Sequence, residues 1–507
     1  MKGNLAIVNA NVIPMADDKR FSAILVENGD IRALGTDSEI RALAGDYEVV
    51  DAQGATVLPG LFDCHVHALM TGMNSLGIDM YNCKDIAEVL SLLREAHATW
   101  EPERFLFGKR LDESRLAEGR PPVMAELDEI PRPVLLSDRG GHYVVLNRLA
   151  FEALKIDPTL RGVRLDEQGQ PNGRLQDEAN KVARGIFFDM WPRSQRKEAI
   201  KLTAQMAVSK GITTIDAMEG FDGGIDDVRM ILDMKDELPF DINVFWLADK
   251  VEDAMGLGMD HWVGDLLIDG TIGSRTAAFR DKFADGDTCG YLNHTDEYVY
   301  NIVDTALKND LCISFHVIGE LGILQALEQM EKALEANPEK KDCHRLRLEH
   351  FGYPRPEDIE RCARLRIPVS TQPSFTYLRG GPHSVYRSRL GEERERKGYS
   401  MRRFLDGGLL LGGGSDSDIT PMDSLLGIHA AVNPPYPENA LTPYEAVRMF
   451  TADAAKCSFQ GDRKGTLEVG KQGDLVLLAE DPMTVPDHIK DIKVLLTVHK
   501  GEIVYRG

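Results

Sequence analysis

The spacing of apolar residues divides the chain into two kinds of segment. Near both ends the apolar runs are short and are bounded by Asn, Asp and Gly, which is typical of β-strands. These runs are Leu5–Val8, Ser22–Val26, Tyr47–Val50, Asp474–Leu478 and Val494–Val498. Because the two ends share this pattern, we expect residues 1–58 and 459–507 to pair into one small composite β-domain.

The central part of the chain, residues 59–458, alternates strand-like apolar runs with longer amphipathic stretches. The predicted helices, whose apolar residues recur every three or four positions, are Asp85–Thr99, Arg196–Lys210 and Leu321–Glu335. The predicted strands are Val57–Leu61, Val134–Leu136, Ile212–Ala217, Asp265–Asp269, Cys312–His316, Leu346–Phe351, Ile367–Thr371 and Leu409–Leu411. This alternation favours an α/β fold with a (β/α)8 TIM-type barrel, in which catalytic residues lie at the C-terminal ends of the strands.

Composition narrows the range of partners. With 59 Lys and Arg against 81 Asp and Glu, the 507-residue chain has a formal charge of −22, which argues against nucleic acid or an anionic membrane as a partner. The acidity serves solubility or favours a cationic substrate. Seven scattered cysteines suit a reducing compartment, and no apolar run reaches the ~18 residues of a membrane span. We therefore expect a cytoplasmic protein that acts on a small molecule, and a homo-oligomer stays open.

The sharpest local motif is the His-x-His pair His65 and His67. Residues two apart on a strand face the same side, so both imidazoles can bind one metal ion, although the pair alone is also compatible with a structural role. His316 and His350 each end a predicted strand, and Asp416 follows a run of glycines at the end of another. Four histidines and one aspartate at strand ends point to a divalent metal site.

These residues resemble the metal ligands of the amidohydrolase superfamily, in the order that the family uses along strands one, five, six and eight. The closer match is to its amidohydrolase-3 branch, which includes N-substituted formamide deformylases and lies near D-aminoacylases. The stretches that support the resemblance, which covers essentially the whole chain, are Asp269–Ala278, Phe315–Gly319, Gly414–Asp416 and Gly465–Lys471. The resemblance implies a metal-dependent barrel with a composite β-domain, and it favours eight barrel strands over six or seven.

One position departs from that branch. Its members often carry a lysine, carboxylated to bridge two metals, four residues before the Asp of the Asp269-Gly270 pair, and this chain has Asp265 there. An aspartate cannot form a carbamate, although it could itself bind or bridge a metal, or serve only as a charge at the strand end. We therefore expect one tightly held divalent ion, zinc or another, and leave a second, weaker site open.

The predicted chemistry is hydrolysis of an amide or N-formyl C–N bond in a small molecule. Zinc lowers the pKa of bound water to about 7, so a nucleophile is available at neutral pH. Asp416 is the candidate general base that takes the proton and passes it to the leaving nitrogen, and His350 polarises the carbonyl or completes the metal shell. Glu320 could orient a metal ligand or act in proton transfer, and the competing interpretation is a solvated carboxylate at a helix N-terminus.

Substrate contacts are harder to predict. The candidates are His142, which resembles a histidine that the branch places near the pocket, Arg275, and Tyr377 and His383 in a loop that could close as a lid. Ordinary packing or surface exposure is the competing interpretation for each, and Arg275 could instead pair with an acid in the barrel wall. Two other functions stay open: deamination of a cyclic amidine or nucleobase, and a non-catalytic metal-binding or regulatory barrel.

Overall fold

The largest sheet of the protein consists of eight parallel strands. The computed structural model describes residues 3–138, 143–220, 224–247, 251–255 and 262–507. The sheet runs in the order β7-β14-β15-β16-β17-β18-β19-β20. Its strands are β7 (Leu61–Val66), β14 (Ile212–Glu219), β15 (Asp241–Trp246), β16 (Trp262–Leu267), β17 (Cys312–Val317), β18 (Arg345–His350), β19 (Val369–Thr371) and β20 (Leu411–Gly413). This arrangement confirms the predicted (β/α)8 TIM-type fold.

The barrel closes where the ends of β7 and β20 meet. The backbone N–H of Asp416 donates to the carbonyl oxygen of His65, and that of His67 donates to the carbonyl oxygen of Ser417, both at 2.7 Å. Val66 and Ser417 also form a parallel bridge. The chain that leaves β20 therefore lies beside the His-x-His pair, although more than three hundred residues separate them in the sequence.

Helices follow most of the barrel strands. They include α8 (Ile225–Met234), α10 (Asp296–Lys308), α11 (Glu320–Ala336), α12 (Pro356–Leu365), α16 (Met401–Asp406) and α17 (Ser424–Val432). The chain after β19 also forms the short helices α13 (Pro373–Arg379), α14 (Val385–Leu390) and α15 (Glu392–Lys397) before α16 begins. None of the described helices is both long enough and apolar enough to cross a lipid bilayer.

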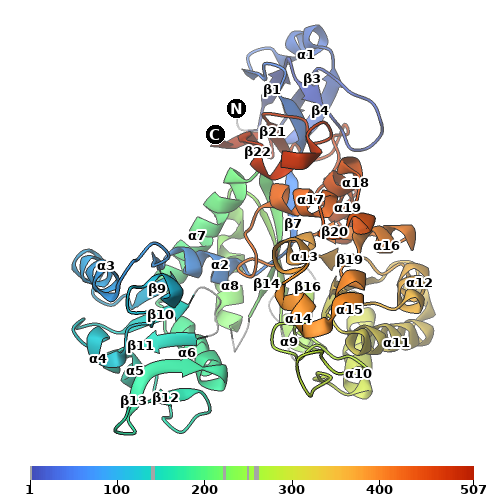
Figure 1. Cartoon of the computed structure of the whole chain (residues 1–507). Coiled ribbons are helices and arrows are strands. Elements are labelled where there is room, and N and C mark those ends of the chain that lie inside the picture. Colours follow the sequence, from blue (N-terminus) through green and yellow to red (C-terminus); the bar gives the residue numbers. More distant parts are fainter. Residues whose placement is uncertain (1–2, 139–142, 221–223, 248–250, 256–261) are drawn as a thin grey trace. The chain divides into compact units, whose positions relative to one another are not determined.

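Both ends of the chain contribute to one β-domain, as predicted. Strand β21 (Leu475–Leu478) pairs antiparallel with β6 (Thr56–Pro59) and with β22 (Val494–His499), and the sheet is completed by β2 (Asn11–Val12) and β23 (Glu502–Arg506). A second sheet contains β1 (Leu5–Val8), β3 (Ala23–Glu27), β4 (Asp30–Gly35) and β5 (Glu48–Asp51). Apolar side chains from the two ends, such as those of Ile7 and Val498, share one buried core, and Figure 1 draws the blue and red strands together.

Two of the predicted barrel strands are wrong. Val134–Leu136 lies in β10 (Val134–Asp138), which belongs to a separate six-stranded sheet with the order β12-β13-β11-β10-β9-β8. The run Val57–Leu61 is divided, because β6 joins the β-domain and the barrel begins with β7. The third barrel strand, β15, was not predicted, since Asp241 and Asn243 interrupt its apolar run.

The separate sheet belongs to a second compact unit, residues Leu69–Leu202, while the first unit contains Met1–Ala68 and Thr203–Gly507. The other strands of the second unit are β8 (Ile78–Asp79), β9 (Leu106–Leu111), β11 (Tyr143–Leu146), β12 (Val163–Leu165) and β13 (Pro171–Gln176). The predicted helix Asp85–Thr99 is present as α3 (Ile86–Thr99), with Asp85 accepting a capping hydrogen bond from the backbone N–H of Glu88. It therefore packs in this unit rather than between barrel strands.

Candidate metal centre

His65 on β7 and His67 just after its end face the same side, because side chains of an extended chain alternate. Their rings meet edge to face with centroids 5.5 Å apart. The His65 side chain is fully buried, and that of His67 is 15% exposed. Cys64 faces the opposite side, where its thiol lies near Ser458, so the alternation separates it from the histidines.

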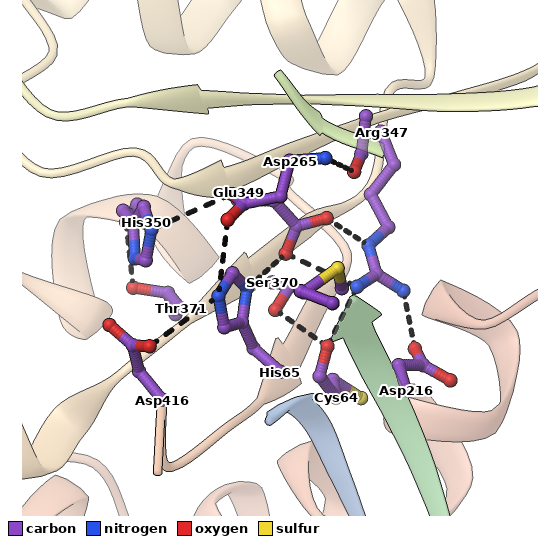
Figure 2. Close-up of polar contacts among 12 residues, drawn as sticks. Cys64, His65, Asp216, Asp265, Arg347, Glu349, His350, Ser370, Thr371 and Asp416 are labelled. Atoms are coloured by element: carbon purple, nitrogen blue, oxygen red, sulfur yellow. Dashed lines mark hydrogen bonds and ion pairs between the residues drawn. The ribbon is translucent and has the colours of Figure 1, made fainter. Parts of the chain in front are cut away.

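Three further candidate ligands reach the same place through unusual backbone conformations. Asp265, His350 and Asp416 have φ angles of 56°, 68° and 52°, in the left-handed region that residues other than glycine rarely adopt. The pairing of β16 with β17 shifts register at Asp265, and such a bulge re-aims a side chain. The backbone N–H of Asp265 donates to Ser314 Oγ at 3.0 Å. The strand ends are thus bent so that these side chains face His65 (Figure 2).

His65 Nε2 belongs to two possible ligand groups. One group is His65, His67 and Asp416, the other is His65, Asp265 and His350, and the donor atoms within each group lie within 4.8 Å of one another. His65 Nε2 is 3.6 Å from Asp416 Oδ1 and 3.7 Å from Asp265 Oδ2. Among the described residues, His65 Nε2 and Asp265 Oδ1 have no hydrogen-bond partner although both are buried. Such orphaned donor atoms fit a divalent ion, which would satisfy them together.

The other nitrogen of each imidazole is held by a neighbouring oxygen. The three contacts are His65 Nδ1 to Glu349 Oε2 at 2.9 Å, His67 Nδ1 to the carbonyl oxygen of Met218 at 3.0 Å, and His350 Nδ1 to Gln372 Oε1 at 2.7 Å. An Nδ1–H that donates in this way leaves the lone pair on Nε2, and ligating histidines are usually held so. The contacts therefore leave three Nε2 atoms available to bind a metal ion.

Buried carboxylates give the centre a negative electrostatic field. Burial raises the pKa of Asp265 to about 7. Burial opposes protonation of His67, but the hydrogen bond to Asp416 and the charge of that carboxylate outweigh it and raise the pKa of His67 to about 10. Burial also works against the charge of Asp416, yet His65 and His67 hold the pKa of Asp416 well below its usual range. A pocket that stabilises positive charge in this way also suits a metal cation.

His316 and His350 are neutral imidazoles at pH 7. Burial, followed by the charge of His65, lowers the pKa of His350 to about 4. Burial and the nearby His350 lower the pKa of His316 well below its usual value. Their ring centroids are 4.5 Å apart, but His316 is in neither ligand group of the described residues. Both are in the protonation state that binds metal, and His350 is the better placed.

Three charged residues next to the ligands were missed in the sequence. Glu349 accepts the hydrogen bond from His65. Arg347 forms buried ion pairs with both Glu349 and Asp216. Burial would raise the pKa of Glu349, but Arg347 and His65 hold it below its usual range. The available signal was Arg347 and Glu349 at alternate positions of β18, on either side of Leu348, because polar residues two apart on a strand face the same side.

Two of the predicted site residues have partners elsewhere. Glu320 begins α11, and its Oε1 accepts a hydrogen bond from the backbone N–H of Arg280 at 2.8 Å. Arg275 forms a two-pronged ion pair with Asp285, at 2.9 and 3.1 Å. The contacts recorded for these two side chains in the described part of the chain do not join them to the ligand cluster.

The remaining predicted substrate contacts lie outside the cluster or cannot be placed. The hydroxyl of Tyr377 lies 3.2 Å from His429 Nε2 and accepts a hydrogen bond from Lys490 Nζ at 2.9 Å. His383 is exposed, with a φ of 69°. His142 lies outside the described residues.

Comparison with known proteins agrees with this geometry. The model of the amidohydrolase family matches residues 48–505. The protein YtcJ of Bacillus subtilis (strain 168) is 27% identical over 526 residues, which cover 97% of both chains. N-substituted formamide deformylase of Arthrobacter pascens is 26% identical over 545 residues, 99% of this chain and 98% of that protein. An uncharacterized metal-dependent hydrolase from Pyrococcus furiosus has the same fold, with a TM-score of 0.82 at 24% identity over 95% of this chain and 100% of that chain. The predicted resemblance is therefore confirmed, and the chain belongs to the amidohydrolase family.

Proposed function

We propose that this protein is a metal-dependent hydrolase that cleaves an amide or N-formyl C–N bond in a small molecule. The observation that carries the proposal is the convergence of His65, His67, His350, Asp265 and Asp416 at the C-terminal end of the barrel, where barrel enzymes place their active sites. The similarity to N-substituted formamide deformylase over nearly the whole chain supports the type of bond. The described metal dependence of the Pyrococcus furiosus neighbour supports the cofactor.

The shared position of His65 supports one tightly held ion. An imidazole nitrogen has a single lone pair, so His65 Nε2 can complete only one of the two ligand groups at a time. Asp265 lies within reach of both His65 and His350, at 3.7 and 3.9 Å, and can serve as a terminal ligand without the carbamate that a lysine would supply. Zinc suits this mixture of nitrogen and oxygen donors, as do other divalent ions.

Asp416 and His350 have different roles in this proposed reaction. A bound divalent ion would polarise the scissile carbonyl and acidify water. Asp416 is ionised at neutral pH, and because its Oδ1 faces His65 and His67, Oδ2 accepts the proton of the attacking water and returns it to the leaving nitrogen. His350 donates from Nδ1 to Gln372, so Nε2 has a lone pair rather than a proton. This favours a ligand role for His350 over hydrogen bonding to the carbonyl.

A substrate panel tests this function. N-formyl and N-acyl amines are compared with cyclic amidines and nucleobases, using protein reconstituted with zinc and protein stripped by a chelator. We expect equal amounts of amine and carboxylate, and only from the reconstituted protein. Ammonia release from the cyclic amidines would establish the deaminase alternative. Hydrolysis that continues in the stripped protein would contradict metal dependence.

A further inference from the structure

Arg347 is a fully buried arginine inside the barrel whose guanidinium joins three strands. It lies on β18 and donates to Asp216 Oδ2 on β14 at 2.5 Å and to the carbonyl oxygen of Cys64 on β7 at 2.7 Å. Its Nε and Nη2 donate to the two oxygens of Glu349, at 2.7 and 3.1 Å (Figure 2). A two-pronged pair of this kind fixes the carboxylate plane as well as its position.

Glu349 transmits this fixed orientation to His65. Its Oε2 accepts the hydrogen bond from His65 Nδ1 at 2.9 Å. The backbone just before His65 is also fixed, because the carbonyl oxygen of Cys64 accepts hydrogen bonds from both Arg347 and Ser370 Oγ, the latter at 3.2 Å. Both the ring and the backbone of His65 are therefore held, which aims Nε2 at the ligand groups.

Four buried carboxylates lie at or near His65, and Arg347 pairs with two of them. Asp216, Glu349, Asp265 and Asp416 are buried carboxylates, and the only guanidinium among the residues described at this network is that of Arg347. An excess of buried negative charge is strongly unfavourable unless a cation offsets it. Arg347 offsets the charges of Asp216 and Glu349, whereas Asp265 and Asp416 lie against the imidazoles of His65 and His67.

We propose that Glu349, held in place by Arg347, is a positioning residue that sets the affinity of this centre for its metal ion through His65. Glu349 gives His65 Nδ1 a charged acceptor, which strengthens Nε2 as a donor to the metal. The inference rests on the metal centre of the proposed function, but it is independent of which bond the enzyme cleaves.

The test replaces Glu349 with Gln, which has the same shape and retains an oxygen for His65 Nδ1 but removes the charge. Zinc affinity is measured by competition between the apoprotein and a chromophoric chelator, and the visible spectrum of the Co²⁺-loaded protein reports the ligand geometry. We expect the E349Q variant to bind zinc ~10–100-fold more weakly, with an altered cobalt spectrum. Equal zinc affinity and an unchanged spectrum would overturn the proposal.

Two further variants separate positioning from general stability. D216N removes the charge of Asp216, the other carboxylate that pairs with Arg347, but leaves the contact between Glu349 and His65. It should therefore lower the unfolding temperature and change the zinc affinity by less than about threefold. If D216N weakens zinc binding as much as E349Q does, the effect is structural and the proposal fails.

Should E349Q fold poorly, the triple variant D216N/R347M/E349Q removes the three buried charges of this network together. It should fold and still bind zinc weakly, whereas wild-type affinity in the folded triple variant would contradict the role of Glu349. Absence of zinc binding in the wild-type chain would instead contradict the proposed metal centre itself.

Discussion

Asp416 is the residue on which the proposed chemistry depends most directly. Replacing it with Asn preserves the side-chain size but removes the charge that accepts the proton. We expect kcat to fall by about 10²–10⁴-fold, while the metal content changes by less than about twofold because the histidines and Asp265 still bind the ion. Parallel assays of turnover and metal content test this. An unchanged kcat would show that Asp416 is not the base.

The sequence could predict candidate ligands at strand ends but not the residues that contact them from behind. His65, His67, His350 and Asp416 were predicted because barrel chemistry lies where strands end. Glu349 was missed because strict alternation places it on the opposite side from His350. The left-handed backbone at His350, with a φ of 68°, breaks that alternation, so both neighbours contribute to one centre. A local conformation of this kind has no signal in apolar spacing.

At the scale of single elements, the close packing around Gly264 in β16 positions the neighbouring candidate ligand Asp265. A Cβ atom at Gly264 would lie 2.6 Å from Phe245 Cδ1 and would also clash with Ser314 Oγ, the atom that receives the backbone N–H of Asp265. We therefore expect Gly264→Ala to lower the free energy of unfolding by about 1–3 kcal/mol and to weaken metal binding. Chemical denaturation and chelator competition measure the two effects. Wild-type values for both would show that the close approach at Gly264 is unimportant.

Two loops beyond the barrel strands are tied together by Asp285. Its carboxylate binds Arg275, from the loop after β16, and Arg389 in α14. The guanidinium of Arg275 is therefore paired with this carboxylate. Replacing Asp285 with Asn should cost about 1 kcal/mol locally and speed amide hydrogen exchange in both segments by about fivefold. The matched control is D287N in the same loop, since Asp287 pairs with Lys282 on the open surface and should change exchange little. Equal exchange in D285N and the wild type would refute the tie.

The prediction of barrel strands failed where a barrel strand and a strand of another sheet have the same apolar pattern. Val134–Leu136 has the composition of a buried parallel strand, and nothing in the run itself distinguishes a barrel strand from a strand of a second sheet. Conversely, Asp241 and Asn243 obscured β15. Asn243 donates to Asp216 Oδ1 at 2.7 Å and Asp241 pairs with Lys464, so both polar positions of β15 make long-range contacts. These contacts are with residues distant in the sequence, so the local pattern of apolar residues does not predict them.

At the scale of the whole first unit, ion pairs join the barrel to the C-terminal part of the β-domain. Asp241, at the start of β15, binds Lys464 and also accepts from Lys500 Nζ at 2.7 Å. Lys464 is buried and has Asp474 as a second partner at 3.1 Å. We expect Asp241→Asn to lower the free energy of unfolding by about 3 kcal/mol at pH 7, the lower end for a broken buried pair, because Asp474 remains. Denaturant unfolding measures it, and a loss below about 0.5 kcal/mol would contradict the role of this pair.

The same contact gives a pH dependence with a definite sign. Burial would raise the pKa of Asp241, but Lys464 and Lys500 outweigh it and hold the pKa below its ordinary value. The folded pKa is therefore below the unfolded value of about 3.9, so the stabilisation is complete well above pH ~4 and is lost as the pH falls through and below that value. The stability difference between wild type and D241N should shrink from pH 5 to pH 3. A difference that stays constant would contradict this assignment.

The central claim is that the barrel holds a divalent ion at His65, and elemental analysis tests it most directly. Purified protein is stripped with a chelator, reconstituted with excess zinc, and passed through a desalting column before the metal in each chain is counted. The account predicts about one tightly retained ion per chain, because His65 Nε2 can serve only one ligand group at a time. Retention of no ion by the folded chain would contradict the metal centre, and two tightly held ions would contradict the single site.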